Sequence, residues 1–304
     1  MPWYFFAFLS PLLWSISNHI DKYILGKYLK DANSGVVAIF AGFVGFFFSL
    51  GILIFSPESV FGISTFHAVL IILNGALLVA AFIPYFYALN EEDASAVVPL
   101  YQTIPIFSFT LGFILLGESI GLLQIVAGIL IILGSVLISV DLSKSGFHFK
   151  KRSMFLMLLS SFMISLHYLV FKYVALEESF WRTVFWEYLG AVLVALFLLV
   201  FLRRYRTQFI DLMRNNSLGV ISINVLNEII NIGAKLFANY ASLIIPIVVV
   251  NLANGLQPLF VFGIGALLTI FLPSISKEQI SRQYVIQRIG AIVILFIGTY
   301  LLII

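Results

Sequence analysis

Ten long apolar segments alternate with short polar connections along this chain of 304 residues. Each segment can cross a bilayer as a helix, because about 20 residues at a rise of roughly 1.5 Å span the ~30 Å hydrocarbon core. Lipid tolerates only helices and closed barrels, and these runs are too long for barrel strands. The pattern therefore predicts an all-α membrane protein with ten transmembrane helices, at Trp3–Lys22, Ser34–Phe55, His67–Leu89, Ala94–Leu116, Gly121–Val140, Ser153–Tyr173, Arg182–Leu202, Ser217–Asn239, Ile244–Phe271 and Tyr284–Ile303.

The eighth segment, Ser217–Asn239, departs from the others because one side of it is polar. At about 100° per residue its polar side chains fall within an arc of roughly 120°. Such a stripe is expected to face a bundle interior or a wet cavity rather than lipid. The alternative is that the amides only hold helices together. The stripe consists of Asn224, Asn227, Glu228, Asn231, Lys235 and Asn239.

Composition narrows the class of protein further. Hydrophobic residues make up 62% of the chain and charged residues only 10%, which excludes a soluble domain of this size. The absence of cysteine excludes disulfides and thiolate chemistry, and four scattered histidines do not indicate a metal site. The net charge of +3 comes from basic residues in short loops, so it does not indicate nucleic-acid binding. The N-terminal stretch lacks a basic leader region and is read as the first span.

Basic residues predict an orientation for the spans. Of the 17 Lys and Arg residues, 14 lie in or beside the odd-numbered connections. The positive-inside rule places these connections in the cytoplasm and both termini outside. The 14 residues are Lys22, Lys27, Lys30, Lys144, Lys150, Lys151, Arg152, Arg203, Arg204, Arg206, Arg214, Lys277, Arg282 and Arg288.

The two halves of the chain resemble each other. An offset of 153 residues superimposes Asn74 on Asn227 and Pro105 on Pro258, and an offset of 150 superimposes Lys22 on Lys172. Five spans per repeat is an odd number, so the second repeat is expected to run inverted, as in alternating-access transporters. The predicted organisation is one five-helix repeat at residues 1–141, a basic connecting loop at 142–152 and a second repeat at 153–304.

The stretch Tyr87–Ile138 carries a family resemblance. It combines the YAL end of a span, the small-residue entry ASAVV, a mid-span proline, the turn LLGE and a following glycine-bearing helix. In these features it resembles the EamA family of the drug/metabolite transporter superfamily, and Tyr240–Leu301 is similar but lacks the glutamate after the span. The resemblance implies five plus five helices and the transport of small metabolites such as amino acids, sugars and nucleotide-linked compounds. It also implies cytoplasmic termini, contrary to the charge count, and leaves a homodimer through the last helix of each half open.

Further polar positions extend the candidate substrate site beyond the stripe. The ninth segment places amides beside Pro258, and proline frees a backbone carbonyl and kinks a helix. Transporters build their sites at such breaks, and the alternative is a helix kink whose amides only hold helices together. The added substrate-binding candidates are Asn74, Tyr85, Tyr101, Gln102, Asn251, Asn254 and Gln257, beside Asn224, Asn227, Glu228, Asn231 and Lys235 of the stripe.

Other polar residues are open to more than one interpretation. His167 is either a group that titrates near neutral pH or, as is more usual for a lone histidine on an apolar helix, a hydrogen-bonded core residue. Glu187 is either an interfacial group or a proton carrier. On the first segment, Ser15, His19 and Lys22 share a face and form either a polar entrance or a set of side chains reaching the membrane edge.

The function predicted from these features is secondary transport of a small polar metabolite by alternating access, in the inner or plasma membrane. No nucleotide-binding or hydrolase motif is present, so neither an enzyme activity nor a cofactor is expected. Two alternatives remain: a flippase subunit for a lipid-linked sugar, and an intramembrane enzyme. The expected partners are a small-molecule substrate and the lipid bilayer, with no nucleic acid.

Overall fold

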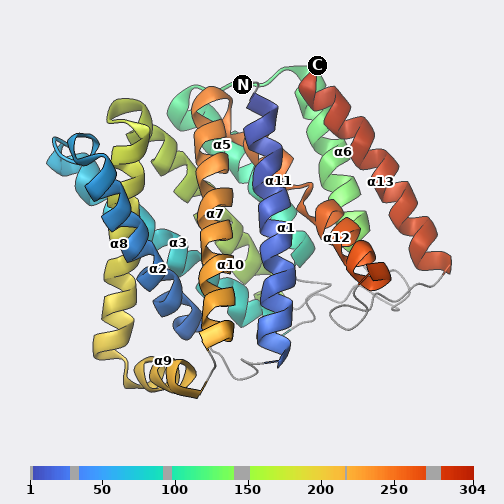
Figure 1. Ribbon diagram of the computed structural model, residues 1–304. Helices are drawn as coiled ribbons and strands as arrows, with labels where there is room; N and C mark the ends of the chain where they lie inside the picture. Colours follow the sequence, from blue (N-terminus) through green and yellow to red (C-terminus); the bar gives the residue numbers. More distant parts are fainter. Residues whose placement is uncertain (1–2, 28–33, 92–97, 140–150, 216–217, 272–281) are drawn as a thin grey trace.

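The computed structural model describes residues 3–27, 34–91, 98–139, 151–215, 218–271 and 282–304, and these ranges contain helices and no strand (Figure 1). The predicted connecting loop at 142–152 lies almost entirely outside them, as do Lys30, Lys144, Lys150 and Lys277. The α-helices are α1 (Trp3–Lys27), α2 (Ser34–Phe55), α3 (Thr65–Glu91), α5 (Ile104–Leu116), α6 (Leu122–Ser139), α7 (Lys151–Glu177), α8 (Phe180–Phe201), α9 (Arg203–Asn215), α10 (Leu218–Ile244), α11 (Ile247–Asn254), α12 (Gln257–Phe271) and α13 (Arg282–Ile303). Two 3-10 turns, η1 (Pro57–Ser59) and η2 (Val98–Thr103), precede α3 and α5.

The apolar pattern predicted the positions of these helices well. Every predicted segment overlaps one helix or a consecutive pair. Within the described ranges, seven helical stretches are long and apolar enough to cross a membrane, and Leu100–Leu116 and Leu122–Ile138 are shorter apolar helices. The all-helical prediction is therefore confirmed, and the chain has the helix content of a multi-pass membrane protein.

Helix α9 was not predicted, because the basic run after the seventh segment was read as a loop. Its apolar residues recur every four positions, and Phe209 and Met213 pack against a buried hydrophobic cluster of the bundle. The ring of Tyr205 lies so close to Gly35 of α2 that a Cβ there would be 2.5 Å from it. Only 13 residues long, α9 is amphipathic and too short to span a bilayer. Its exposed residues include Arg203, Arg204, Arg206 and Arg214.

The ninth predicted segment is two helices instead of one. Helix α11 ends at Asn254, and α12 begins at Gln257, one residue before Pro258. The chain therefore breaks just before the proline, at Gly255, whose carbonyl accepts a hydrogen bond from Ser135 of α6. In the first half Pro105 is likewise the second residue of α5, after η2. Proline is favoured in the first turn of a helix, where its missing N–H has no partner to lose.

Four helix pairs make the main contacts of the bundle. They are α1 with α10, α3 with α7, α2 with α8, and α6 with α13. The last pair is close because Gly134 and Gly298 leave no room for a Cβ, which would meet the facing helix within 3 Å in each case. This agrees with the expectation that small residues form helix-packing faces in membranes.

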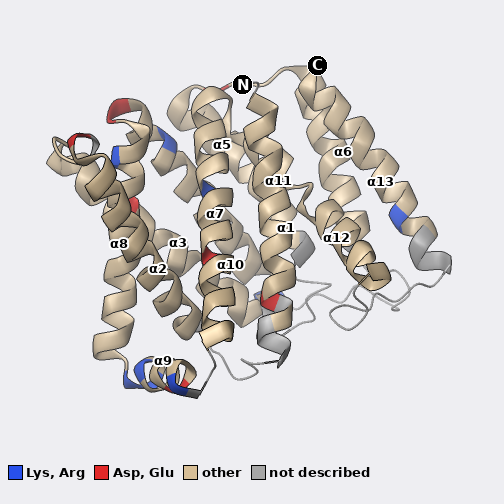
Figure 2. Cartoon of the chain, viewed as in Figure 1, with Lys and Arg blue, Asp and Glu red and all other residues tan. Residues whose placement is uncertain are grey.

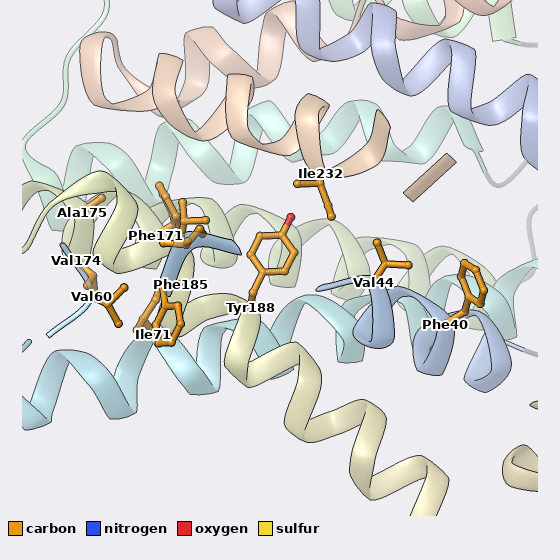
Figure 3. Close-up of a cluster of buried hydrophobic side chains, with 12 residues drawn as sticks. Phe40, Val44, Val60, Ile71, Phe171, Val174, Ala175, Phe185, Tyr188 and Ile232 are labelled. Atoms are coloured by element: carbon orange, nitrogen blue, oxygen red, sulfur yellow. The ribbon is translucent and has the colours of Figure 1, made fainter. Parts of the chain in front are cut away.

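Two buried hydrophobic clusters lie on either side of the bundle. The first joins α2, α3, α7, α8 and α10 and includes Phe171, Tyr188 and Ile232; Figure 3 shows Tyr188 pointing toward Ile232 of α10. The second joins α6, α11 and α13 and includes Val249 and Leu295. A third, smaller cluster of Ala, Val and Ile side chains from α1, α10 and α11, with Tyr168 and Leu169 of α7, lies between them.

The two ends of the bundle differ in charge. Both chain termini lie at the end opposite α9, and the arginines of α9 form the main basic patch in view (Figure 2). At the other end Trp3 and Ile245 pack against the same hydrophobic cluster, and Ile245 directly follows the end of α10 that is far from α9. Since α10 has 27 residues, the two ends are about 40 Å apart along it. The basic end and the end with the termini are therefore on opposite sides, as the charge count requires.

Candidate functional site

A buried ion pair lies where α3, α7, α8 and α10 meet. Glu187 of α8 is fully buried, and its Oε2 is 2.9 Å from Nζ of Lys235 on α10. Its Oε1 accepts a hydrogen bond of 3.0 Å from the amide of Asn74 on α3. Nδ1 of His167, on α7, is 3.5 Å from the same oxygen. Glu187, whose role the sequence left open, is thus the centre of a network that joins four helices.

Two glycines allow these helices to approach. A Cβ on Gly75 of α3 would lie 2.1 Å from the carbonyl oxygen of Glu187, and one on Gly190 of α8 would lie 2.0 Å from that of Ile72. Only glycine permits such backbone contact between α3 and α8. Because the backbones are this close, Asn74, next to Gly75, reaches the Glu187 carboxylate. On the α10 side, the Lys235 ammonium lies over the ring of Tyr188, 4.7 Å from its centroid.

His167 completes the network as a core residue. It is almost fully buried, and its Nδ1 is 3.4 Å from the backbone oxygen of Asn74. In turn Asn74 donates a second hydrogen bond of 3.2 Å to the backbone oxygen of His167. The prediction of a hydrogen-bonded core histidine is therefore confirmed, and α3 and α7 are joined in both directions at this level.

The part of the α10 stripe nearer the start of the helix faces α1. Asn227 is buried and donates a hydrogen bond of 2.6 Å to Oδ1 of Asp21. Glu228 and Asn231 are half-buried, while the amide of Asn224 turns back to the carbonyl of Val220 in its own helix. None of the stripe residues is exposed, so the prediction that the stripe avoids the outer surface of the bundle is confirmed.

A second polar chain runs from α7 to α11. Ser165 of α7 and Ser108 of α5 are 2.9 Å apart, and Ser108 accepts a hydrogen bond of 2.7 Å from Asn251 of α11. Asn254 donates to Oδ1 of Asn251 at 3.5 Å. The serine row on α7 was not singled out from the sequence, although Ser160, Ser161 and Ser165 already share one side of a helix.

The aromatic candidates, Tyr85 of α3 and Tyr101 of η2, lie near Ser160 of α7. The rings of Tyr85 and Tyr101 are 5.1 Å apart, and the Tyr101 hydroxyl is 3.3 Å from Oγ of Ser160. Gln102 lies beside Gly255, whose Cβ position would be 3.1 Å from its Oε1. Gln257 begins α12, and its backbone oxygen accepts a hydrogen bond from Ser15 of α1 at 3.1 Å.

The predicted site residues therefore fall into separate polar groups. Lys235 and Asn74 meet at Glu187, and Asn227 meets Asp21 and lies next to Glu228 on α10. Asn251 forms hydrogen bonds with both Ser108 and Asn254. The ring of Tyr101 packs against that of Tyr85, and its hydroxyl lies near Ser160. Ser15 and His19 bind backbone carbonyls of α12, at Gln257 and Val261, and so fasten α1 to α12.

Several of these buried amides keep unused hydrogen-bonding groups. Within the described part of the chain, no partner reaches Oδ1 of Asn74, Asn227 and Asn254 or either amide atom of Asn239. Buried polar groups in proteins nearly always have a partner. These atoms of α3, α10 and α11 therefore retain the capacity for a further hydrogen bond.

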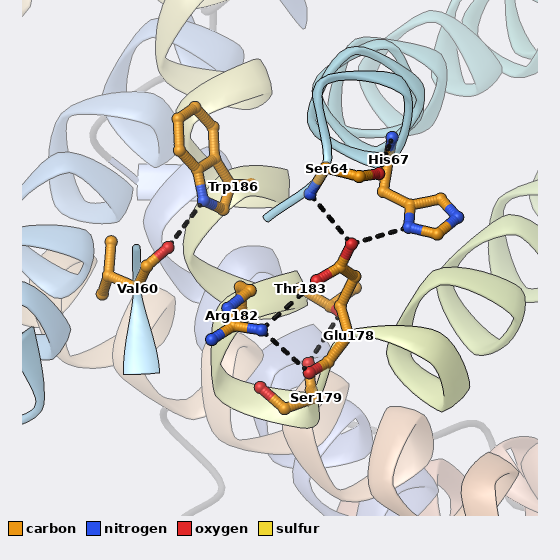
Figure 4. Close-up of polar contacts among 8 residues, drawn as sticks. All are labelled: Val60, Ser64, His67, Glu178, Ser179, Arg182, Thr183 and Trp186. Carbon is orange, nitrogen blue, oxygen red and sulfur yellow. Dashed lines mark hydrogen bonds and ion pairs between the residues drawn. The ribbon is translucent and has the colours of Figure 1, made fainter. Parts of the chain in front are cut away.

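A separate polar cluster caps the end of the bundle that carries the termini (Figure 4). Glu178 follows α7 and accepts hydrogen bonds from the backbone N–H of Ser64 at 3.0 Å and from His67 at 2.7 Å. It also pairs with Arg182 at 3.2 Å. The Ser64 N–H, first, and the His67 side chain hold the pKa of Glu178 below its ordinary value. This cluster fastens the start of α3 to the turn between α7 and α8.

Comparisons with known proteins show what this chain is similar to. A search of the curated proteins found no match. Among solved structures, one described as "Crystal structure of protein" matches with a TM-score of 0.66 at 13% sequence identity. The match covers 98% of this chain and 95% of the other, so the two share a fold. The model of the EamA-like transporter family matches residues 1–140. This family belongs to the drug/metabolite transporter superfamily, so residues 1–140 of the chain are similar to EamA-like transporters.

Proposed function

We propose that this protein is a secondary transporter that moves a small polar metabolite across the inner or plasma membrane by alternating access. The observation that carries the proposal is the Glu187–Lys235 pair, buried where four helices meet. Ionisable groups inside a membrane protein are costly and usually mark a substrate or ion pathway. The match of residues 1–140 to the EamA-like transporter family supports a membrane transporter of this type.

The proposed architecture has ten spans in two inverted repeats of five. Under the offset found in the sequence, α3 corresponds to α10 and α7 to α1. The observed pairs α3–α7 and α10–α1 correspond in the same way. Asn74 bonds to α7, and Asn227, its repeat mate, bonds to α1. These matching contacts support a site between the repeats, near the middle of the membrane.

Roles for the site residues follow from their charges and partners. Lys235 would attract an anionic group of the substrate and would exchange its contact with Glu187 for that group. The unused amide groups of Asn74, Asn239 and Asn254 would hydrogen-bond the polar remainder. Glu228, seven residues from Lys235 and half-buried, is the candidate for proton coupling.

Transport of labelled metabolites into proteoliposomes tests the proposal. A thermal-shift screen of the purified protein against a metabolite library first identifies candidates. A hit should accumulate in proteoliposomes that contain the parent protein, and Lys235→Met should abolish the uptake. Movement of a lipid-linked sugar between leaflets, without uptake of any soluble metabolite, would instead favour the flippase alternative. Chemical conversion of a hit would favour an intramembrane enzyme.

A further inference from the structure

The geometry points to an ion pair between Glu118 and Lys172 as a latch that positions α11 and closes one end of the transport pathway. Glu118 lies in the turn after α5, and Lys172 lies near the end of α7. The inference rests on the proposed transport function. It assigns a gating role to two residues that take no part in the network around Glu187.

The pair holds both sides of a helix break. Nζ of Lys172 is 2.5 Å from Oε1 of Glu118 and donates a hydrogen bond of 2.9 Å to the backbone oxygen of Ile245. Oε2 of Glu118 accepts a hydrogen bond of 2.9 Å from the backbone N–H of Ile247. Pro246 lies between these two residues. The cation therefore satisfies a carbonyl at the end of α10, and the anion satisfies the first N–H of α11, each matching the helix dipole.

The latch lies beside the third hydrophobic cluster. Ile247, whose N–H Glu118 binds, belongs to that cluster, as do Tyr168 and Leu169 of α7, one turn before Lys172. Helix α11 itself packs against α1, α5 and α6. It carries Asn251 and Asn254 toward the polar chain at Ser108. Holding the first turn of α11 against α7 therefore positions these two amides.

The latch has no counterpart in the repeat. The offset of 150 residues places Lys22 at the position of Lys172, but the offset of 153 places Phe271 at the position of Glu118. Phe271 is highly exposed, at the opposite end of α12 from the break. A charged pair that fastens the end with the termini, with an apolar residue at the equivalent position, makes the two ends of the pathway unequal. Breaking the pair should release α11 from α7 at that end only.

Cysteine accessibility tests the latch, because the chain has no native cysteine. Val250→Cys on α11 is the reporter, since Val250 is fully buried one turn below Ile247. We expect Glu118→Gln to make this cysteine react about tenfold faster with a membrane-impermeant maleimide, from the end with the termini; tenfold corresponds to roughly 1.4 kcal/mol in the opening equilibrium. Lys172→Met should act in the same way, while Lys172→Arg should keep the parent rate.

Two controls separate release of the latch from other effects. Glu178→Gln removes a carboxylate that also binds a backbone N–H and a basic side chain, but between helices of the first cluster. It should leave the reporter protected. A second reporter, Ala195→Cys, is buried between α2 and α8 and should stay unreactive in every variant.

The outcomes are distinct. If Glu118→Gln leaves the labelling of Val250→Cys unchanged, the pair is not a latch, even if the protein transports. If Ala195→Cys becomes reactive together with Val250→Cys, the pair supports folding in general and the proposal is wrong. If labelling rises as expected but no solute is transported by the parent protein, the latch stands and the proposed transport function fails.

Discussion

Lys235 and Glu187 form an ion pair of 2.9 Å although they belong to different helices and Glu187 is fully buried. The lysine that we propose attracts an anionic group of the substrate therefore already has a carboxylate partner in this state. A substrate anion must take over the position of the Glu187 carboxylate, or bind beside it. The pair is thus both a structural contact and the proposed recognition group.

Removing one partner of this pair should cost more stability than removing both. Lys235→Met leaves a buried carboxylate without its cation, which typically costs about 3–5 kcal/mol. The double variant Glu187→Gln with Lys235→Met should recover most of that loss, because an amide needs no counter-charge. Thermal unfolding of the purified variants in detergent measures both effects. A double variant less stable than either single one would contradict this account.

Transport assays should separate the roles of Glu228 and Lys235. We expect Glu228→Gln to keep folding and substrate binding but to abolish the dependence of transport on a pH gradient. Lys235→Met should lose binding. Normal expression and parental transport in both variants would mean that the stripe only holds helices together.

Glycine substitutions should show how closely α3 and α8 are packed. Gly190→Ala places a Cβ 2.0 Å from a backbone oxygen, and Gly75→Ala places one 2.1 Å from another, so the helices must separate. We expect each to destabilise the protein by about 1–3 kcal/mol or more. The matched control is Gly263→Ala, where nothing lies within 4 Å; it should be neutral or slightly stabilising, by up to ~1 kcal/mol. Equal effects at all three sites would refute the close contact.

The Glu178 cluster should make stability fall in acid. The pKa of the Glu178 carboxyl is lower in the folded protein than its ordinary value of 4.5. As the pH falls, this carboxyl therefore binds a proton in the unfolded chain before it does so in the folded protein. The stabilisation is fully present above pH 4.5 and is lost as the pH falls toward the folded pKa. Glu178→Gln should be less stable at neutral pH and should show a shallower loss in acid. Unfolding temperatures measured across this range provide the check; parallel curves would exclude the cluster as the cause.

Single cysteines at the two ends should establish the orientation. Thr207 is exposed on the basic helix α9, and Glu58 is exposed in η1 at the opposite end. Since the positive-inside rule places α9 in the cytoplasm, Thr207→Cys should resist an impermeant thiol reagent in intact cells while Glu58→Cys reacts. The reverse pattern would show that the termini are cytoplasmic, as the family resemblance implies.

The apolar pattern determined the helices and the placement of the polar stripe without reference to any contact. Segment length follows from helix rise and bilayer thickness, and the cost of exposing amides to lipid requires that Asn227 and Lys235 face inward. The sequence pattern did not predict helix α9, because a short amphipathic helix between spans has the composition of a loop. The offset between the halves likewise came from sequence alone.

The tertiary structure decided which polar groups meet. Sequence placed Lys235 and Glu187 on different helices and could not show that Gly75 and Gly190 bring those helices together. It also could not pair Glu118 with Lys172 across a break at Pro246. Spacing along one helix determines which side chains share a face, whereas partners on other helices depend on how closely the backbones approach and in which register. Those quantities are set by the packing of the whole bundle, so the functional pairs appear only in the folded chain.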